Sequence, residues 1–374
     1  MTKEGMRILI APDKFKGTLT AREVGENIAA GLRDVLPDAK IDIVPMADGG
    51  EGTAEVISQA LGGSWLKCQA HDPLGREIET RYGWIDQQKL AVMEMSEAAG
   101  MRRLTAEELN PEIATTFGVG EIILDAAKRD AKEIIIGLGG SATNDGGVGM
   151  ALALGFGFLG KGGAKLDCLK QSSLQEVERI KKPRDLKLPK IVAAVDVKNP
   201  LLGENGATRV FGPQKGVTPD KIDTLERALT RLADVVAGQF GFDYRNEPGS
   251  GAAGGLGFGL MSFCGAKIRP GFDVVAEAVA LELKMKDVDL VITGEGSLDR
   301  QTLEGKTPAG VARLARKLGK RVFAIAGRRD ENRQVRELFD EVYALAEPGM
   351  SERENIKRAA ELLRERAQEL AKAL

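Results

Sequence analysis

The chain has 374 residues, of which 43% are hydrophobic and 29% charged, a composition typical of a globular protein that buries a sizeable core. Its 53 basic and 55 acidic residues leave a net charge of −2, and basic charge is not concentrated in any arm or tail. The charge pattern therefore predicts a protein that binds neither nucleic acid nor a membrane surface. Three scattered cysteines, a short apolar run at the start and the lack of a span-length apolar stretch predict a cytoplasmic location.

The amino-terminal segment alternates apolar strands with amphipathic helices. Residues 7–11 and 39–46 are predicted strands, and residues 20–36 and 52–61 are predicted helices. Thr20 and Glu23 have the spacing of a capping box at the start of the first helix. A strand and helix alternation with short connections indicates a parallel sheet covered by helices.

The middle of the chain has a different pattern. Residues 64–95 are predicted to form three strands separated by turns at 73–75 and 86–88. After them the apolar spacing predicts helices at 116–129, 147–156 and 218–241, strands at 133–137 and 190–197, and a Gly-rich loop at 251–259.

Strand and helix alternation returns at the end of the chain. The pattern predicts strands at 287–293, 321–327 and 341–346, and helices at 307–319, 332–339 and 351–374. Thr307 and Pro308 read as the N-cap and first residue of one helix. We therefore expect an α/β protein with two α/β domains: a discontinuous Rossmann-like parallel-sheet domain formed by 1–70 plus 286–374, and an inserted mixed α/β domain at 71–285.

The loops after the predicted strands are rich in Gly together with charged or hydroxyl side chains. Ligands of open α/β sheets bind beyond the carboxyl ends of the strands, so these loops are where a site is expected. They lie at 11–18, 47–53, 137–147, 196–206, 212–216, 251–259, 294–302 and 328–331. Each loop alone is typical of an ordinary turn, but their concentration indicates a binding site.

Two familiar nucleotide motifs are incomplete. Gly305-Lys306-Thr307 resembles the end of a P-loop, but Arg300 stands where that pattern requires glycine. Gly137, Gly139 and Ala142 match a dinucleotide fingerprint, but the expected acidic residue after the next strand is missing. A more general role fits this loop better: its Ser141, Thr143 and Asn144 could bind an anionic group near the helix that follows.

The charged residues of these loops suit phosphoryl transfer. That reaction needs a carboxylate to accept a proton, oxygen ligands for Mg²⁺ and cations to stabilise the moving phosphoryl group. Asp48, Asp196 and Asp299 lie at or just beyond predicted strand ends, and Lys14, Lys16, Lys215 and Lys306 lie in the loops. His71 is the single histidine and is predicted to be a solvated loop residue.

Eight stretches of this chain together resemble the bacterial glycerate kinase family that makes 2-phosphoglycerate. They are "APDKFKGTLTA" (11–21), "PMADGGEGT" (45–53), "ATTFGVGE" (114–121), "GLGGSATNDGG" (137–147), "NPLLGENGAT" (199–208), "FGPQKG" (211–216), "GAAGGLG" (251–257) and "TGEGSLDRQT" (293–302). The resemblance implies ATP-dependent phosphorylation of the 2-hydroxyl of D-glycerate with Mg²⁺. It also implies two α/β domains, one of them Rossmann-like and discontinuous, with the site between them.

The resemblance leaves individual roles open, and the residue chemistry predicts them as follows. One of Asp48, Asp196 and Asp299 accepts the substrate proton, and Asp196 and Asp299 are candidates to hold Mg²⁺. Lys14 and Lys16 are expected to bind carboxylate or phosphate oxygens. The remaining candidates for substrate or nucleotide binding are Ser141, Thr143, Asn144, Lys215, Gly294 and Gly296.

Two other classes of function stay open on the residues alone. A NAD-dependent hydroxy-acid dehydrogenase would need a base such as His71 and a complete dinucleotide fingerprint. A non-catalytic small-acid binding protein would not need so many acidic loops. The expected partners of the chain are therefore glycerate and ATP.

Overall fold

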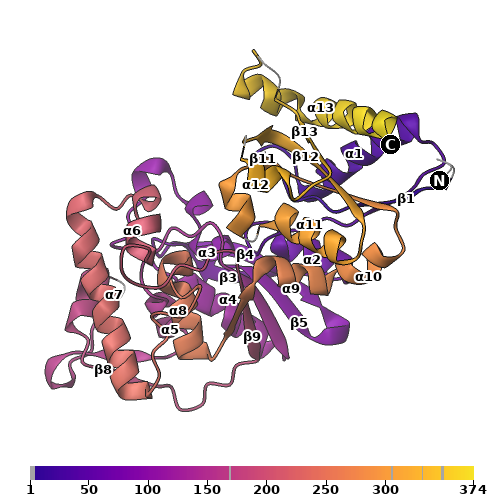
Figure 1. Cartoon of the computed structure of the whole chain (residues 1–374). Helices are drawn as coiled ribbons and strands as arrows, with labels where there is room; N and C mark the ends of the chain where they lie inside the picture. Colours follow the sequence, from indigo (N-terminus) through magenta and orange to yellow (C-terminus); the bar gives the residue numbers. More distant parts are fainter. Residues whose placement is uncertain (1–4, 168–169, 305, 331, 347–348) are drawn as a thin grey trace. The chain divides into compact units, whose positions relative to one another are not determined.

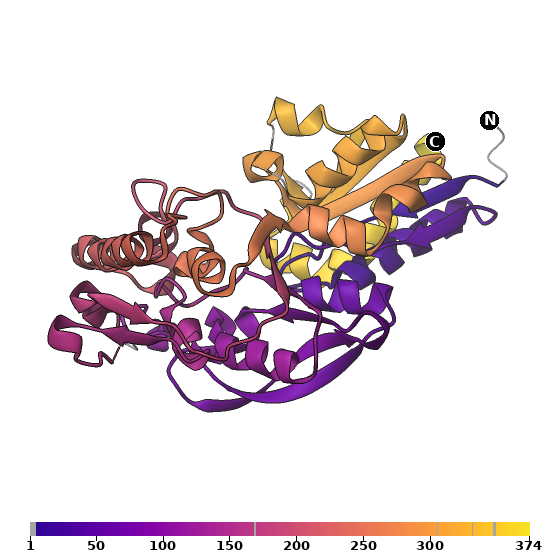
Figure 2. The same ribbon diagram turned by 90° about the horizontal axis from the view of Figure 1, so that it is seen from below.

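The computed structural model describes residues 5–167, 170–304, 306–330, 332–346 and 349–374. The chain divides into two compact units. The discontinuous unit contains the residues up to Asp48 together with Phe272–Leu374, and the inserted unit is Gly49–Gly271. The indigo and yellow ends of the chain lie together in both Figure 1 and Figure 2, as expected for a unit built from the two chain ends.

The discontinuous unit is built on a parallel sheet. Its five strands have the order β13-β12-β11-β1-β2, and every neighbouring pair is parallel. The strands are β1 (Arg7–Ile10), β2 (Lys40–Ile43), β11 (Leu290–Leu298), β12 (Arg321–Arg329) and β13 (Glu341–Ala344). The chain leaves β1 toward β2 on one side and leaves β11 toward β12 on the other, so the strand order reverses between β1 and β11.

Helices cover both faces of this sheet, as right-handed connections in opposite directions require. On one face α1 (Ala21–Val35) packs against α13 (Glu352–Ala373), and α11 (Thr307–Lys317) packs on β11 and β12 from the other (Figure 1). The predicted capping box of Thr20 and Glu23 is confirmed. The shorter helices of the unit are α9 (Gly271–Ala278), α10 (Leu281–Lys286) and α12 (Arg333–Arg336).

The inserted unit has a mixed sheet with the order β10-β9-β6-β5-β4-β3. The pairs from β10 to β5 are parallel, and β5-β4 and β4-β3 are antiparallel. The strands are β3 (Ser64–His71), β4 (Glu77–Ile85), β5 (Leu90–Glu94), β6 (Glu133–Gly137), β9 (Lys190–Val195) and β10 (Lys267–Pro270); β7 (Gly157–Leu159) and β8 (Arg179–Lys181) form a separate ribbon. The expected α/β class is confirmed, and the two large sheets are one parallel and one mixed.

Most helices of the inserted unit share one large apolar core with its sheet: α3 (Ser96–Ala99), α4 (Phe117–Lys128), α5 (Val148–Ala153), α6 (Ala207–Phe211), α7 (Pro219–Phe240) and α8 (Ala252–Cys264). The remaining helix, α2 (Thr53–Ala60), packs on β4 and β5 outside this cluster. Phe156, Phe158 and Phe240 all pack edge-on against Phe263 of α8, so this helix anchors the core.

The observed bounds of the two units differ from the expected bounds at 70 and 286. Residues 49–70 belong to the inserted unit because β3 pairs with β4 along its whole length and α2 packs on β4 and β5. Residues 272–285 belong to the discontinuous unit, where the ring of Phe272 lies against the backbone of Gly310 in α11. Apolar periodicity identifies a strand but carries no information about which sheet it joins.

Two Gly-rich segments that were predicted as loops are regular structure. Strand β11 continues through Gly294 and Gly296 to Leu298, because it keeps pairing with β12. Residues 252–264 form α8, whose first turn has three residues in the left-handed region, Ala253, Gly254 and Gly255. A Cβ at Gly254 would collide with the carbonyl of Thr143, so this close approach requires glycine.

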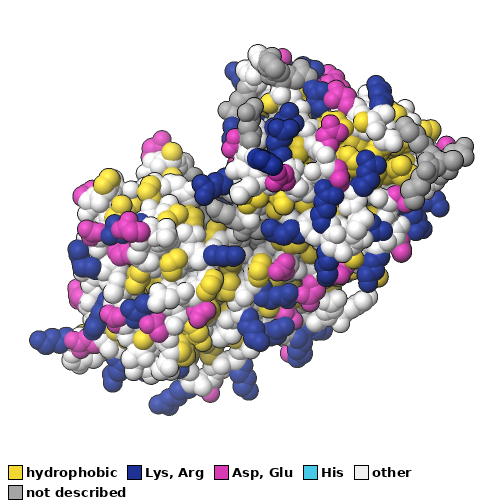
Figure 3. All heavy atoms as spheres, in the orientation of Figure 1, with side chains coloured by type: hydrophobic (Ala, Val, Ile, Leu, Met, Phe, Trp, Pro, Cys, Tyr) yellow, Lys and Arg dark blue, Asp and Glu magenta, His cyan; other side chains and the backbone are white. Residues whose placement is uncertain are grey.

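The surface is of mixed charge. Figure 3 shows basic and acidic side chains interspersed over the face in view. Within the described ranges, none of the helices combines the length and the apolar character that a membrane span requires.

Candidate active site

The carboxyl ends of β1 and β11 define the candidate site of the discontinuous unit. The strand order reverses between these two strands, and ligands of open α/β sheets bind at such a switch point. Here the backbone N–H of Asp13 donates to the carbonyl of Gly294 at 2.8 Å, which ties the loop after β1 to the end of β11. Beyond Gly294, β11 still pairs with β12 but no longer with β1, so its later residues border an opening.

A cavity of about 500 Å³ lies at this opening. Its polar lining has three carboxylates and four cationic side chains; they belong to Asp13, Asp48, Glu295, Lys14, Lys16, Lys306 and Arg328. All of these residues belong to the discontinuous unit. The cavity therefore combines groups that could accept a proton with groups that could hold an anion.

Asp13 is the most firmly oriented carboxylate of the cavity. Its side chain is only 6% exposed. The hydroxyl of Thr307 donates to Oδ2 at 2.6 Å, and the backbone N–H of Lys14 donates to Oδ1 at 2.7 Å. Burial and the nearby charge of Asp48 raise the pKa of Asp13 to about 7, although both hydrogen bonds act in the opposite direction.

Glu295 is a second buried carboxylate. It lies on the extension of β11 and is 9% exposed. The hydroxyl of Thr302 donates to Glu295 Oε1 at 2.8 Å and accepts the backbone N–H of Asp299 at 3.1 Å. Burial raises the pKa of Glu295 to about 8, against the lowering effects of the Thr302 hydrogen bond and the charge of Lys306; the charges of Asp13 and Asp48 add smaller increases.

The predicted residues of this unit fall into two groups. Lys14, Lys16, Asp48 and Gly296 line the cavity. Gly294 is buried within β11 and contributes its carbonyl to Asp13, whereas Asp299 follows β11 outside the cavity lining and accepts the Ser297 hydroxyl at 3.3 Å.

The polar residues of the site that were missed from the sequence include Asp13, Glu295, Thr307 and Arg328. Asp13 lies in the loop after the first strand, and Glu295 lies between two glycines of a quoted motif, so both had the position that points to a ligand. Thr307 was predicted to be an N-cap. Instead Lys306 is the N-cap residue, and Thr307 begins α11 and uses its hydroxyl on Asp13.

The Gly-rich loop of the inserted unit forms a separate, buried polar cluster. Lys215 is 1% exposed, and its Nζ donates to the carbonyl of Thr143 at 2.7 Å. Asn144 is fully buried and donates through Nδ2 to the Thr208 hydroxyl at 3.0 Å. Burial lowers the pKa of Lys215 to about 7, with Asp145 acting in the opposite direction.

The backbone N–H groups at the start of the helix after this loop already bind a protein carboxylate. Asp145 accepts the backbone N–H groups of Gly147 and Gly149 at 3.0 and 3.1 Å, at the start of α5. An anion bound there would compete with Asp145. The predicted binding roles of Ser141, Thr143 and Asn144 therefore stay predictions, and the exposed Asp196, directly after β9, likewise has no role assigned by geometry.

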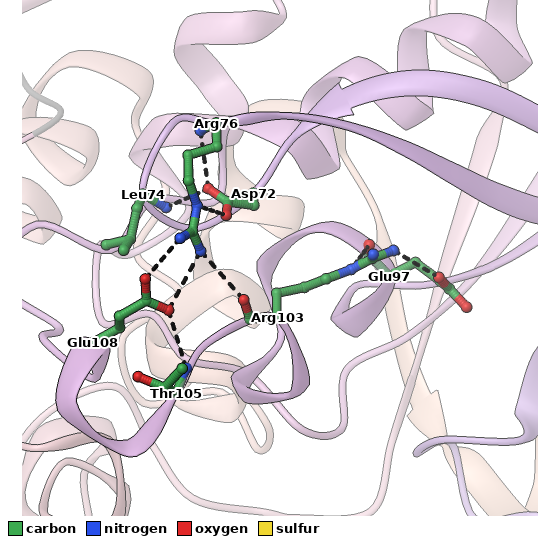
Figure 4. Close-up of polar contacts among 7 residues, drawn as sticks. All are labelled: Asp72, Leu74, Arg76, Glu97, Arg103, Thr105 and Glu108. Atoms are coloured by element: carbon green, nitrogen blue, oxygen red, sulfur yellow. Dashed lines mark hydrogen bonds and ion pairs between the residues drawn. The ribbon is translucent and has the colours of Figure 1, made fainter.

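An ion-pair network supports the neighbouring segment of this unit (Figure 4). Arg76 binds the buried Asp72 through Nε at 2.5 Å and Glu108 through a terminal nitrogen at 2.7 Å, and Arg103 binds Glu97. The network joins the β3–β4 turn to the segment after α3. That segment pairs with the Gly-rich loop through the Gly100 and Ser141 bridge, so the network helps to position the loop.

His71 was predicted to be a solvated loop residue, and this is wrong. It is the last residue of β3 and is partly buried, with Nδ1 2.9 Å from a carboxylate oxygen of Glu121 and its ring edge-on to Phe117. The dinucleotide fingerprint also fails in the structure. Strand β6 ends at Gly137 and α5 begins only at Val148, whereas that motif needs a tight turn from strand to helix.

Comparison with known proteins gives consistent matches over nearly the whole chain. Residues 8–374 match the model of the glycerate kinase family. Glycerate kinase of Bacillus subtilis is 39% identical over 99% of this chain and 98% of its own length. Glycerate 2-kinase of Escherichia coli is 43% identical over 86% of this chain and 85% of its own length. A crystal structure from Salmonella typhimurium LT2, provisionally assigned as glycerate kinase 2, superposes with a TM-score of 0.85 at 38% identity and covers 99% of this chain and 98% of the other.

Proposed function

Because the chain belongs to the glycerate kinase family, we propose that it transfers the γ-phosphoryl group of ATP to the 2-hydroxyl of D-glycerate and so forms 2-phospho-D-glycerate. Family membership makes the chain an enzyme, a phosphotransferase with an alcohol group as acceptor. The resemblance indicated by its eight motifs is thereby confirmed. The position of transfer is supported by the name of the Escherichia coli relative, a glycerate 2-kinase.

One observation carries the proposal: the cavity at the β1 and β11 strand ends combines buried carboxylates with several cations. Phosphoryl transfer places negative charge on the oxygens of the moving group and releases a proton from the acceptor hydroxyl. The cations Lys14, Lys16 and Lys306 could stabilise the charge on the phosphoryl oxygens, and the carboxylates could accept the proton. Lysine binds phosphate and carboxylate oxygens as a point charge, which suits both the glycerate carboxylate and the phosphates of ATP.

The residues near the end of β11 also fit Mg²⁺. The ion takes oxygen ligands, typically one or two protein carboxylates together with water and substrate phosphates. Asp299 offers such a carboxylate beside the Ser297 hydroxyl. Within the described ranges no three His, Cys, Asp or Glu side chains form a metal cage, so an ion here would depend on one or two carboxylates and the nucleotide. When bound, Mg²⁺ would neutralise charge on the β- and γ-phosphate oxygens. The assignments of Asp196 and Asp299 as ligands remain proposals.

An ADP-release assay over small hydroxy acids tests this function. With ATP and Mg²⁺ present, D-glycerate is expected to give ADP, and tartronate and other hydroxy acids are expected to give less. The control assay contains NAD in place of ATP, because a dehydrogenase would reduce NAD and would form no ADP. No ADP from any hydroxy acid would refute the proposed reaction.

A further inference from the structure

We propose that the Asp13 carboxylate is the group that accepts the proton of the substrate hydroxyl during phosphoryl transfer. The proposal rests on the proposed function, and it names a residue outside the three aspartates predicted from the sequence. Its starting point is position: Asp13 follows β1 at the switch point of the parallel sheet and lines the cavity there.

The geometry around Asp13 holds the side chain in one orientation. Its backbone is tied to β11 by the hydrogen bond to Gly294, and each carboxylate oxygen receives a hydrogen bond, from Thr307 and from the Lys14 backbone. An ionised carboxylate has about four acceptor positions, so two bonds leave an acceptor position on each oxygen for a substrate hydroxyl. Thr307 is itself buried at the first residue of α11, which keeps its hydroxyl in place.

The other carboxylates match this role less well. Glu295 has a longer side chain and receives one hydrogen bond, from Thr302, on one oxygen. Asp48 lines the same cavity but is only partly buried. Asp299 lies outside the cavity lining, and Asp196 is exposed in the inserted unit. Asp13 thus combines burial, access to the cavity and a fixed orientation.

The charges around Asp13 give it a basicity suited to this task. A general base works best when its pKa lies near the working pH. Burial and the charge of Asp48 hold the Asp13 pKa at about 7, and Lys14 lowers it together with the two hydrogen bonds. The other titratable groups that line the cavity are Glu295 on β11, Lys306 before α11, and Lys16 and Arg328.

The step balances as a single displacement. The hydroxyl oxygen of glycerate forms a bond to the γ-phosphorus of ATP while the bond from that phosphorus to the β–γ bridging oxygen breaks. The bridging oxygen keeps the electron pair and leaves as part of ADP. The proton of the hydroxyl moves to a free lone pair of Asp13, from which it returns to water after the product leaves.

The test compares pH profiles of kcat/KM for the wild type, Asp13→Asn, Thr307→Val and Thr307→Ser, with ATP, Mg²⁺ and D-glycerate. The matched control is Asp42→Asn, an exposed aspartate of β2 outside the cavity. In the wild type, kcat/KM is expected to rise with pH through a midpoint near about 7. Asp13→Asn should lower kcat by about 10²- to 10⁴-fold with little change in KM, and should abolish this rise. Asp42→Asn should retain the wild-type profile.

The variant Thr307→Val tests whether Thr307 acts on the Asp13 carboxylate or only stabilises the fold. Because the Thr307 hydroxyl stabilises the ionised form of Asp13, its loss should move the midpoint to higher pH, and Thr307→Ser should restore it. If circular dichroism shows that Asp13→Asn does not fold, the pH midpoint of kcat/KM in Thr307→Val still tests the proposal. A folded Asp13→Asn enzyme with near-normal kcat, or an unmoved midpoint in Thr307→Val, would overturn the proposal while the kinase function stands. A wild type that phosphorylates no hydroxy acid would overturn both.

Discussion

Replacement of Lys215 by methionine tests the structure of the inserted unit most sharply. The Lys215 side chain is 1% exposed, and its Nζ donates a hydrogen bond to the Thr143 carbonyl. Burial lowers its pKa from 10.5 to about 7. Methionine has a similar length and no charge, so Lys215→Met removes the titration and keeps most of the packing.

The expected change in the free energy of unfolding follows from proton linkage. The folded-state pKa lies below the unfolded one, so between about pH 7 and pH 10.5 the unfolded chain binds the extra proton and stability rises with pH. The slope for one proton is about 1.36 kcal/mol per pH unit, so two units from pH 7.5 to pH 9.5 give a ceiling of about 2.7 kcal/mol. Over this window the free energy of unfolding of the wild type should gain about 2 kcal/mol relative to Lys215→Met.

Urea unfolding followed by tryptophan fluorescence provides the assay. Both tryptophans of the chain, Trp65 and Trp84, lie in the inserted unit with Lys215, so their emission reports on the relevant unit. Lys187→Met is the matched control, because Lys187 is an exposed lysine of the same unit. Its difference from the wild type should not change with pH. If the free energies of unfolding of the wild type and Lys215→Met differ by a constant amount from pH 7.5 to 9.5, Lys215 is not mainly neutral in the folded protein. That result would favour its predicted ligand-binding role.

Two further variants probe buried carboxylates. Glu295→Gln should gain stability relative to the wild type by about 3 kcal/mol as pH rises from 5 to 8, because the raised pKa of Glu295 makes its stabilisation present at low pH and lost through this window. Urea unfolding followed by circular dichroism measures this change, and a pH-independent difference would contradict it. Asp72→Ala should cost about 1–3 kcal/mol, since it leaves the N–H groups of Leu74 and Arg76 without their acceptor; tryptophan fluorescence during urea unfolding checks this, and a cost near zero would show that the network in Figure 4 contributes little.

Most of the fold could be predicted from the sequence because the local signals agree with the final structure. The strand at 7–11, the capping box of Thr20 and Glu23 and the alternation at both chain ends all appear in the discontinuous unit. Apolar spacing does not report sheet membership, which is why residues 49–70 were placed in the wrong unit by the expected bounds. Glycine clusters were read as loops, although packing against the Thr143 backbone makes helix α8 begin with left-handed residues.

The candidate site could be predicted only in part. Lys14, Lys16 and Asp48, from the predicted loops at 11–18 and 47–53, line the cavity. The predicted loop at 251–259 lies in α8, and the start of the one at 294–302 belongs to β11. Acidic residues are common in ordinary turns, so the position of Asp13 and Glu295 after predicted strands pointed to a ligand but did not reveal that both side chains are buried. Their importance comes from burial and from partners far away in the chain: Thr307 lies 294 residues from Asp13. Such contacts exist only once the two chain ends form one sheet.

Phosphorus NMR of the product tests the central claim most directly. The wild-type enzyme, incubated with ATP, Mg²⁺ and D-glycerate, should give ADP and one new phosphomonoester. That phosphorus should couple to the single proton at carbon 2 and appear as a doublet, which identifies 2-phosphoglycerate. A triplet from coupling to the two protons at carbon 3 would contradict transfer to the 2-hydroxyl, and the absence of any phosphoglycerate would contradict the reaction itself.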